Sequence, residues 1–240
     1  MQVNYLNQLS PAVRAFVEEV EAGAGLAVEV VPNAELDDGG PGGEGKLSID
    51  IESQNIQLNA PTNGYFPNGA VRHELLHVQR LHVEHVPRLA VAEEADWDPA
   101  FETGLTRVDN ALEHLVIVPV ELHHHPERRA HWEAVMKQVW EEKLPLVDGL
   151  DRRIGSYLHW TFLRHVMPGS PVLDTAAAFL QVHELQAHAD AFADQLIPQL
   201  GDKVEVVRLF IDRFPEIARE RVALEYLSAL YGTSQQPIPD

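Results

Sequence analysis

The sequence predicts an α+β fold, with a small, mostly antiparallel sheet near the start of the chain and helices through the rest. Apolar and polar residues alternate from Leu47 to Ile51, which is the period of a half-buried strand. After Pro87, apolar residues recur instead at helical spacing. The 240 residues are 45% hydrophobic and 23% charged, as in ordinary globular proteins. We therefore expect a single domain over residues 1–240, with a core over 1–145 and a helical extension over 146–240 packed on that core.

The first sixty residues are predicted to form one helix followed by three strands. Ser10 and Pro11 are typical of a helix start, and Gly23 or Gly25 can end that helix. β-branched and apolar residues then indicate strands separated by a glycine-rich loop over residues 37–45. The predicted strands are Leu26 to Val31, Leu47 to Ile51, and a short third strand around Ile56 and Leu58 that pairs with the second as a hairpin.

The remainder of the chain is predicted to be helical. A helix should begin near Asn68 and end near Val86, because Pro87 disfavours helical geometry in the residue before it. We expect residues 232–240 to form a loose tail. Apolar spacing predicts further helices over Leu105 to Val118, Pro126 to Lys143, Arg152 to Val166, Val172 to Ile197, Lys203 to Arg213 and Pro215 to Tyr231.

One short motif carries chemistry, the segment His73-Glu74-Leu75-Leu76-His77. In a helix, residues four apart share a face, so His73 and His77 can bind one ion while Glu74 reaches a water bound to that ion. The chain has no cysteine, so a transition metal would be held by His, Asp or Glu. Zinc held by three protein ligands keeps a fourth position open for water, which makes zinc the expected cofactor.

The motif and the order of the elements before it resemble the zincin metallopeptidases over about Leu26 to Val118. In that superfamily a strand before the motif helix aligns the substrate backbone. Metzincins place a glycine and a third histidine shortly after the motif, whereas His77 is followed here by Val78-Gln79-Arg80-Leu81-His82. The chain therefore resembles gluzincins more closely, and this resemblance implies a zincin-like core over residues 1–145 with a glutamate on a later helix as the third zinc ligand.

Two segments compete for the role of that glutamate. Glu113 lies at the margin of an apolar helix face, where a polar side chain needs a partner such as a metal. Asp109, four residues earlier, could orient a ligand histidine, although the gluzincin pattern places its acidic residue after the ligand. The rival segment holds Glu93 and Glu94, which are closer to the motif. Glu113 is our prediction for the third ligand.

The resemblance implies a zinc metallopeptidase that cleaves a peptide or protein substrate, with Glu74 as the general base. His114, Tyr157 or His159 could donate a hydrogen bond to the developing oxyanion. One alternative is a zincin-like protein that binds or regulates a partner without turnover. Another is a di-iron oxidoreductase, because Glu74-x-x-His77 and Glu121-x-x-His124 both fit the Glu-x-x-His spacing.

Charge and hydropathy exclude several partners. The formal net charge of −19 would repel nucleic acid and anionic membranes. The chain has no run of eighteen apolar residues and no leader-like start, so we expect a cytoplasmic protein. We expect the remaining histidine clusters to be solvated, with His123 to His125 in a loop and with His183 and His188 too far apart around one helix to chelate an ion. The sequence does not indicate an oligomeric state.

Overall fold

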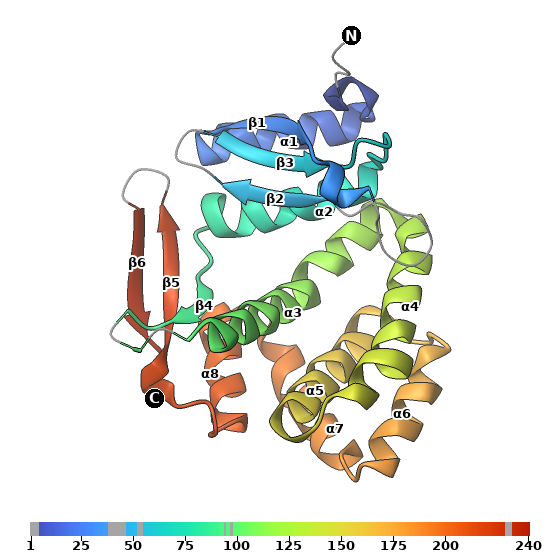
Figure 1. The fold of residues 1–240 in the computed structure, drawn as a ribbon, viewed down its shortest axis with the longest axis vertical. Coiled ribbons are helices and arrows are strands. Elements are labelled where there is room, and N and C mark those ends of the chain that lie inside the picture. The colour runs from blue at the N-terminus through green and yellow to red at the C-terminus, as the bar shows by residue number, and fades with distance from the viewer. Residues whose placement is uncertain (1–4, 38–46, 52–54, 94, 97, 229–231) are drawn as a thin grey trace. The chain divides into compact units, whose positions relative to one another are not determined.

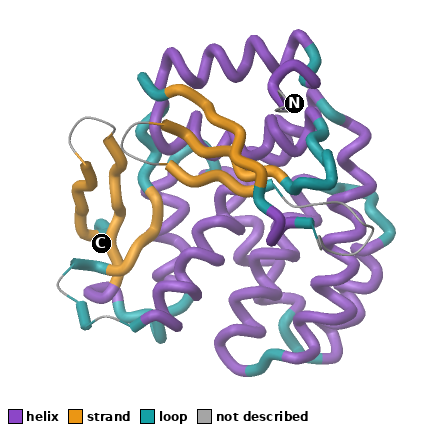
Figure 2. Tube along the Cα trace, turned by 45° about the horizontal axis from the view of Figure 1, so that its top comes forward, coloured by secondary structure: helices purple, strands orange, loops and turns teal. Residues whose placement is uncertain are grey.

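The computed structural model describes residues 5–37, 47–51, 55–93, 95–96, 98–228 and 232–240. Within these residues the fold is α+β, as predicted, with eight α-helices and two three-stranded sheets (Figures 1 and 2). The chain divides into two compact units, one made of Met1–Val86 and Leu227–Thr233 and the other of Pro87–Tyr226 and Ser234–Asp240. The main boundary between the two units falls after Val86.

Helix α1 (Pro11–Ala24) opens the first unit and follows the predicted signals. The Ser10 hydroxyl accepts a hydrogen bond from the Val13 N–H, and Pro11 occupies the first helical position. The helix ends where Gly25 takes a φ of 68°, a left-handed conformation that glycine adopts without steric cost. Ser10 and Gly25 therefore set the two ends of this helix.

The first sheet contains β1 (Ala27–Pro32), β2 (Ser48–Ile51) and β3 (Asn55–Ala60) in the order β1-β3-β2. Strands β2 and β3 are antiparallel, with Ile51 opposite Ile56, which confirms the predicted hairpin. Strand β1 joins β3 in parallel, so the central strand has one neighbour of each direction. Most of the predicted glycine-rich loop lies outside the described residues.

Helix α2 (Asn68–Val78) carries the metal motif and begins at the predicted residue. The Asn68 side-chain oxygen accepts a hydrogen bond of 2.8 Å from the Ser10 N–H, which ties the starts of α1 and α2 together. Past Val78 the chain continues as a π-helical turn, η3 (Gln79–Val83), so the α-helical part is shorter than predicted. His85 then takes a φ of 55°, which ends the helical run just before Pro87.

The second unit is mainly helical, and its longest helix is α3 (Pro99–His124). It starts six residues before the predicted Leu105, because the Asp98 carboxylate caps the N–H groups of Ala100 and Phe101. It also continues past Pro119, where a helix end was predicted. Pro119 lacks an N–H, so the carbonyl of Leu115 receives no intrahelical hydrogen bond from this position.

The other helices of this unit match the helices predicted from the sequence only in part. The single helix predicted over Val172 to Ile197 is two helices, because Glu184 takes a φ of 57° and breaks the run. The predicted helix over Lys203 to Arg213 is confirmed at both ends. The observed helices are α4 (Arg129–Gln138), α5 (Gly149–Val166), α6 (Val172–Val182), α7 (Gln186–Leu196) and α8 (Lys203–Arg213).

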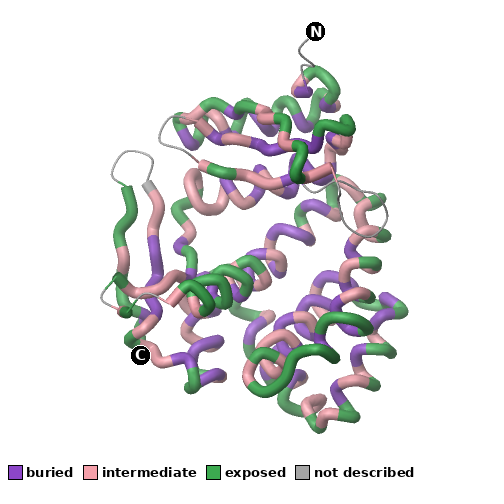
Figure 3. The backbone as a smooth tube through the Cα atoms, viewed as in Figure 1, coloured by how far each residue is buried: buried purple, intermediate pink, exposed green. Residues whose placement is uncertain are grey.

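The second sheet was not predicted. It contains β4 (Arg88–Val91), β5 (Val222–Ser228) and β6 (Gly232–Pro237) in the order β4-β5-β6, so the helix expected over Pro215 to Tyr231 and the loose tail after it are wrong. Strand β5 is buried from Val222 to Glu225 (Figure 3). Its pairing with β4, in which Leu89 lies opposite Leu224, overrides the helical propensity of Ala, Leu and Glu.

Lys203 joins three elements of the second unit through a buried ion-pair network. Its Nζ donates to Asp109 Oδ1 at 2.7 Å and to Glu113 Oε1 at 2.6 Å, and Asp109 Oδ1 also accepts from the Leu89 N–H at 2.9 Å. Burial alone would lower the pKa of Lys203, but Asp109 and then Glu113 outweigh this effect and raise the pKa. The network therefore connects α8, α3 and β4.

We predict that Lys203→Met lowers the free energy of unfolding by about 3–5 kcal/mol, because it leaves the buried Glu113 and the partly buried Asp109 without their cation. Urea denaturation measures this loss. The matched control is Lys137→Met, which removes an exposed i,i+4 pair with Glu141 and should cost less than about 1 kcal/mol. Because the pKa of Lys203 is raised, its contribution should persist below about pH 10.5 and disappear as the pH rises through the folded-state pKa. Equal losses in the two variants would contradict this role.

Candidate metal centre

Helix α2 presents His73 and His77 on one face, as the spacing predicted. The centroids of the two rings lie 5.1 Å apart, and their planes are inclined by 82°. His73 is buried and His77 is partly exposed. The opposite side of the helix buries Val71, Leu75 and Val78 in the first unit, which fixes the direction in which the two imidazoles project.

Glu74 follows His73 directly on the same helix and is partly exposed. A carboxylate one residue round from a metal ligand can reach a water bound to that metal without competing for the ion itself. The position of Glu74 on α2 is therefore compatible with the predicted role of general base.

His114 is the histidine that the sequence did not identify as a ligand. Among the described residues, His73, His77 and His114 form a group that could hold a metal ion, with one ring nitrogen of each within 4.8 Å of the others. Three imidazoles form a known ligand set for catalytic zinc. The sequence signal for His114 was weak, because a single histidine beside a glutamate on an amphipathic helix has no characteristic spacing.

Glu113, the predicted third ligand, makes a different interaction. It is 2% exposed, and its Oε1 accepts a hydrogen bond from Lys203 at 2.6 Å. A metal at Glu113 would have to compete with this buried ammonium group. The group of possible ligands among the described residues contains His114 rather than its neighbour Glu113.

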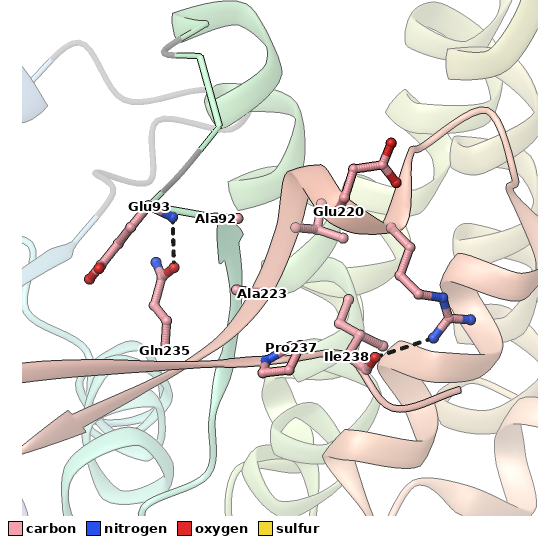
Figure 4. A pocket seen from close by; sticks show the side chains of 9 residues that line it. Ala92, Glu93, Glu220, Ala223, Gln235, Pro237 and Ile238 are labelled. Atoms are coloured by element: carbon pink, nitrogen blue, oxygen red, sulfur yellow. Dashed lines mark hydrogen bonds between the residues drawn. The ribbon is translucent and has the colours of Figure 1, made fainter.

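Of the two carboxylates considered as alternatives to Glu113, only Glu93 is among the described residues. Glu93 is exposed, and its backbone N–H donates to the Gln235 side chain at 2.9 Å. As Figure 4 shows, Glu93 lines an open pocket of the second unit together with Glu220 and Ile238. Glu94 lies outside the described residues.

Within the second unit, His114 packs against an aromatic side chain that is itself hydrogen-bonded to an ion pair. The His114 ring meets the Trp132 ring edge-on, with 5.1 Å between their centroids. The Trp132 indole N–H donates to Glu121 Oε2 at 3.0 Å, and Arg128 Nε donates to Glu121 Oε1 at 2.7 Å. Glu121, which the di-iron alternative would use as a ligand, thus holds Trp132 against the His114 ring.

The other histidine clusters differ from their predicted settings. His123 and His124 lie in the last turn of α3, so the predicted loop over His123 to His125 is wrong for two of its three residues. His183 lies at the end of α6 and His188 lies in α7, so they do not share one helix. Among the described residues, neither His183 nor His188 belongs to a group that could hold a metal.

The two other residues considered as oxyanion donors lie on α5. The Tyr157 hydroxyl is buried and accepts a hydrogen bond from Arg213 at 3.3 Å. Burial, followed by the nearby charge of Lys143, lowers the pKa of His159 to about 4. His159 is therefore neutral at physiological pH.

Comparison of the chain with family models, with curated proteins and with solved structures gave no match. The proposed function therefore rests on the site itself. In the part of the chain that the structure describes, no helix is both long enough and apolar enough to cross a membrane.

We predict that the His159 ring stays neutral down to about pH 4. A titration followed by NMR of the histidine Cε1–H resonances measures this, and His159→Gln assigns the resonance by removing it. Between pH 6.5 and about 4 the unfolded chain binds a proton at this residue that the folded chain does not bind. The free energy of unfolding should therefore decrease as the pH is lowered from 6.5 to about 4. A His159 resonance that titrates with a midpoint near 6.5 would contradict the burial of the ring.

Proposed function

We propose that this chain is a zinc-dependent hydrolase in which His73, His77 and His114 hold the metal and Glu74 is the general base. The observation that carries the proposal is the grouping of three ring nitrogens within 4.8 Å of one another, with a glutamate next to one of the histidines. The three imidazoles fit zinc because it prefers nitrogen ligands, and three protein ligands leave a fourth coordination position open.

Bound zinc would supply Lewis-acid polarisation of a carbonyl group and would lower the pKa of a coordinated water. With zinc bound, Glu74 would act as the general base, accepting a proton from water and later giving it to the leaving group. His73 and His77 keep a fixed separation because they lie one turn apart on α2, and Trp132 packs against His114. These residues therefore position the reacting groups rather than react themselves.

We infer that the bond cleaved is an amide in a peptide or protein substrate. The support is the resemblance of the motif helix and of the sheet before it to the zincin metallopeptidases. The proposed ligand set departs from the gluzincin pattern, since an imidazole from α3 replaces the expected Glu113 carboxylate. A zincin-like core with a third histidine is accordingly part of this proposal.

We predict that the purified protein binds one zinc ion per chain and that His114→Ala weakens zinc binding by more than about 100-fold, the upper range for loss of a residue that only supports a ligand. Isothermal titration with zinc measures the affinity. Glu113→Gln should change zinc affinity less than tenfold. The matched control His188→Ala, at an exposed position of α7, should leave it unchanged. A large loss in Glu113→Gln with no loss in His114→Ala would return the ligand role to the carboxylate.

We predict that Glu74→Gln binds zinc as the parent protein does but loses about 10²–10⁴-fold in the rate of peptide hydrolysis, because the amide cannot accept the proton. A quenched-fluorescence peptide library measures hydrolysis, and elemental analysis measures bound zinc. Full activity in Glu74→Gln would exclude this residue as the base. Bound zinc with no hydrolysis by the parent protein would favour the alternative of a metal-binding protein without turnover.

A further inference from the structure

The second unit contains a large apolar pocket among its helices. The cavity has a volume of about 880 Å³, which is within the range of sites that enclose small organic ligands. Its walls come from α3, α4, α5 and the two short turns η5 (Val139–Lys143) and η6 (Leu144–Leu146). Every wall residue belongs to the second unit, so the pocket is defined within one compact body.

The lining of the pocket is mostly aliphatic and aromatic. Phe101, Trp132, Met136, Leu158 and Phe162 all contribute to it. Sites that bind small organic ligands are recesses of this kind, with mostly apolar walls and a few polar groups. These walls favour the binding of a ligand that carries a large apolar group.

The pocket also has a few charged groups at its edge. Arg107 and Lys143 are exposed residues that line it, and neither forms an ion pair with any described residue. Asp151 is the acidic residue of the lining. The chain as a whole has a net charge of −19, but the lining of this pocket has two cationic side chains and one acidic side chain. The pocket therefore favours a ligand whose apolar group ends in a carbonyl or carboxylate.

Two glycines shape the cavity in different ways. A Cβ added to Gly104, an exposed lining residue on α3, would meet no atom within 4 Å, so the missing side chain leaves this edge of the pocket open. Glycine within a helix costs about 1 kcal/mol relative to alanine, so this opening has a cost in stability. A Cβ added to Gly155 would lie 2.8 Å from Leu144 Cδ2, so this glycine permits η6 to approach α5 closely.

The pocket connects with the proposed metal centre through one residue. His114, which we propose as the third zinc ligand, is itself part of the pocket wall, and so is Trp132, which packs against the His114 ring. A group bound in the pocket would therefore lie beside a metal ligand. This adjacency indicates which part of a substrate the pocket would hold.

We propose that this pocket binds a large apolar group attached to the carbonyl that is hydrolysed, so that the substrates are amides of apolar carboxylic acids. The inference rests on the proposed function. In the reaction the C–N bond of the amide breaks, a C–O bond forms from water, and the water proton passes through Glu74 to the leaving amine. The apolar group can come from a fatty acyl chain or from a bulky apolar residue of a peptide.

The first test is direct binding of dodecanoate, a probe with the apolar chain and carboxylate of such a product. Isothermal titration should show binding to the zinc-loaded protein and weaker binding to the metal-free protein. Gly104→Leu, which places a larger side chain on the pocket wall, should weaken binding at least about tenfold, the loss expected if two methylene groups are kept out. The matched control Thr106→Leu adds the same side chain on the exposed part of α3 outside the pocket and should bind as the parent does.

Three substitutions of increasing size at Gly104 distinguish a loss of pocket space from a loss of folding. Gly104→Ala, Gly104→Leu and Gly104→Trp should weaken dodecanoate binding in that order, while far-UV circular dichroism and urea denaturation show an intact fold. Equal binding across the series, or no binding to the parent protein, would overturn the pocket proposal whether or not zinc binds. Binding that depends on Gly104 but not on zinc would overturn the link between the pocket and the metal. If Glu74-dependent hydrolysis is unchanged by Gly104→Leu, the proposed function stands and this inference fails.

The second test distinguishes the two sources of the apolar group. Parent and Gly104→Leu proteins are compared on N-dodecanoylglycine and on a peptide with phenylalanine on the carbonyl side of the cleaved bond. A fall in kcat/KM of at least about tenfold for one substrate identifies the source. No fall for either substrate would contradict the proposal.

Discussion

The chemistry proposed for this protein depends on the rigidity of α2, which keeps two imidazoles one turn apart. One helical turn advances about 5.4 Å, and the ring centroids of His73 and His77 lie 5.1 Å apart. Val71, Leu75 and Val78 bury the other side of this helix, so it cannot rotate without exposing apolar surface. The hydrogen bond between Ser10 and Asn68 further ties the start of α2 to α1.

The two buried glutamates of α3 each interact with a cation. Glu113 is paired with Lys203, and Glu121 is paired with Arg128 and hydrogen-bonded to Trp132. Removing either carboxylate from its cation would leave a buried charge uncompensated, which is costly. A neutral imidazole has no charge that needs a counter-ion, so in the proposed site His114 would bind a metal at a smaller cost than either glutamate.

The sequence predicted best where local signals decide the structure. Ser10, Pro11 and Gly25 set the limits of α1, alternation set the β2–β3 hairpin, and the motif spacing placed His73 and His77 on one face. The predictions from sequence failed where contacts between distant segments determine the structure. Strand β5 reads as a helix until it pairs with β4, and Lys203 lies 90 residues from Glu113, so no local pattern reveals that the carboxylate already has a partner. The grouping of His114 with the motif and the apolar pocket depend on tertiary structure in the same way.

The most direct test of the account is the anomalous scattering of zinc in crystals of the zinc-loaded protein. We predict a single peak at about 2.0–2.1 Å from one ring nitrogen of each of His73, His77 and His114, with a fourth position taken by solvent. A peak bonded to the Glu113 carboxylate, or the absence of any peak beside the two motif histidines, would contradict it.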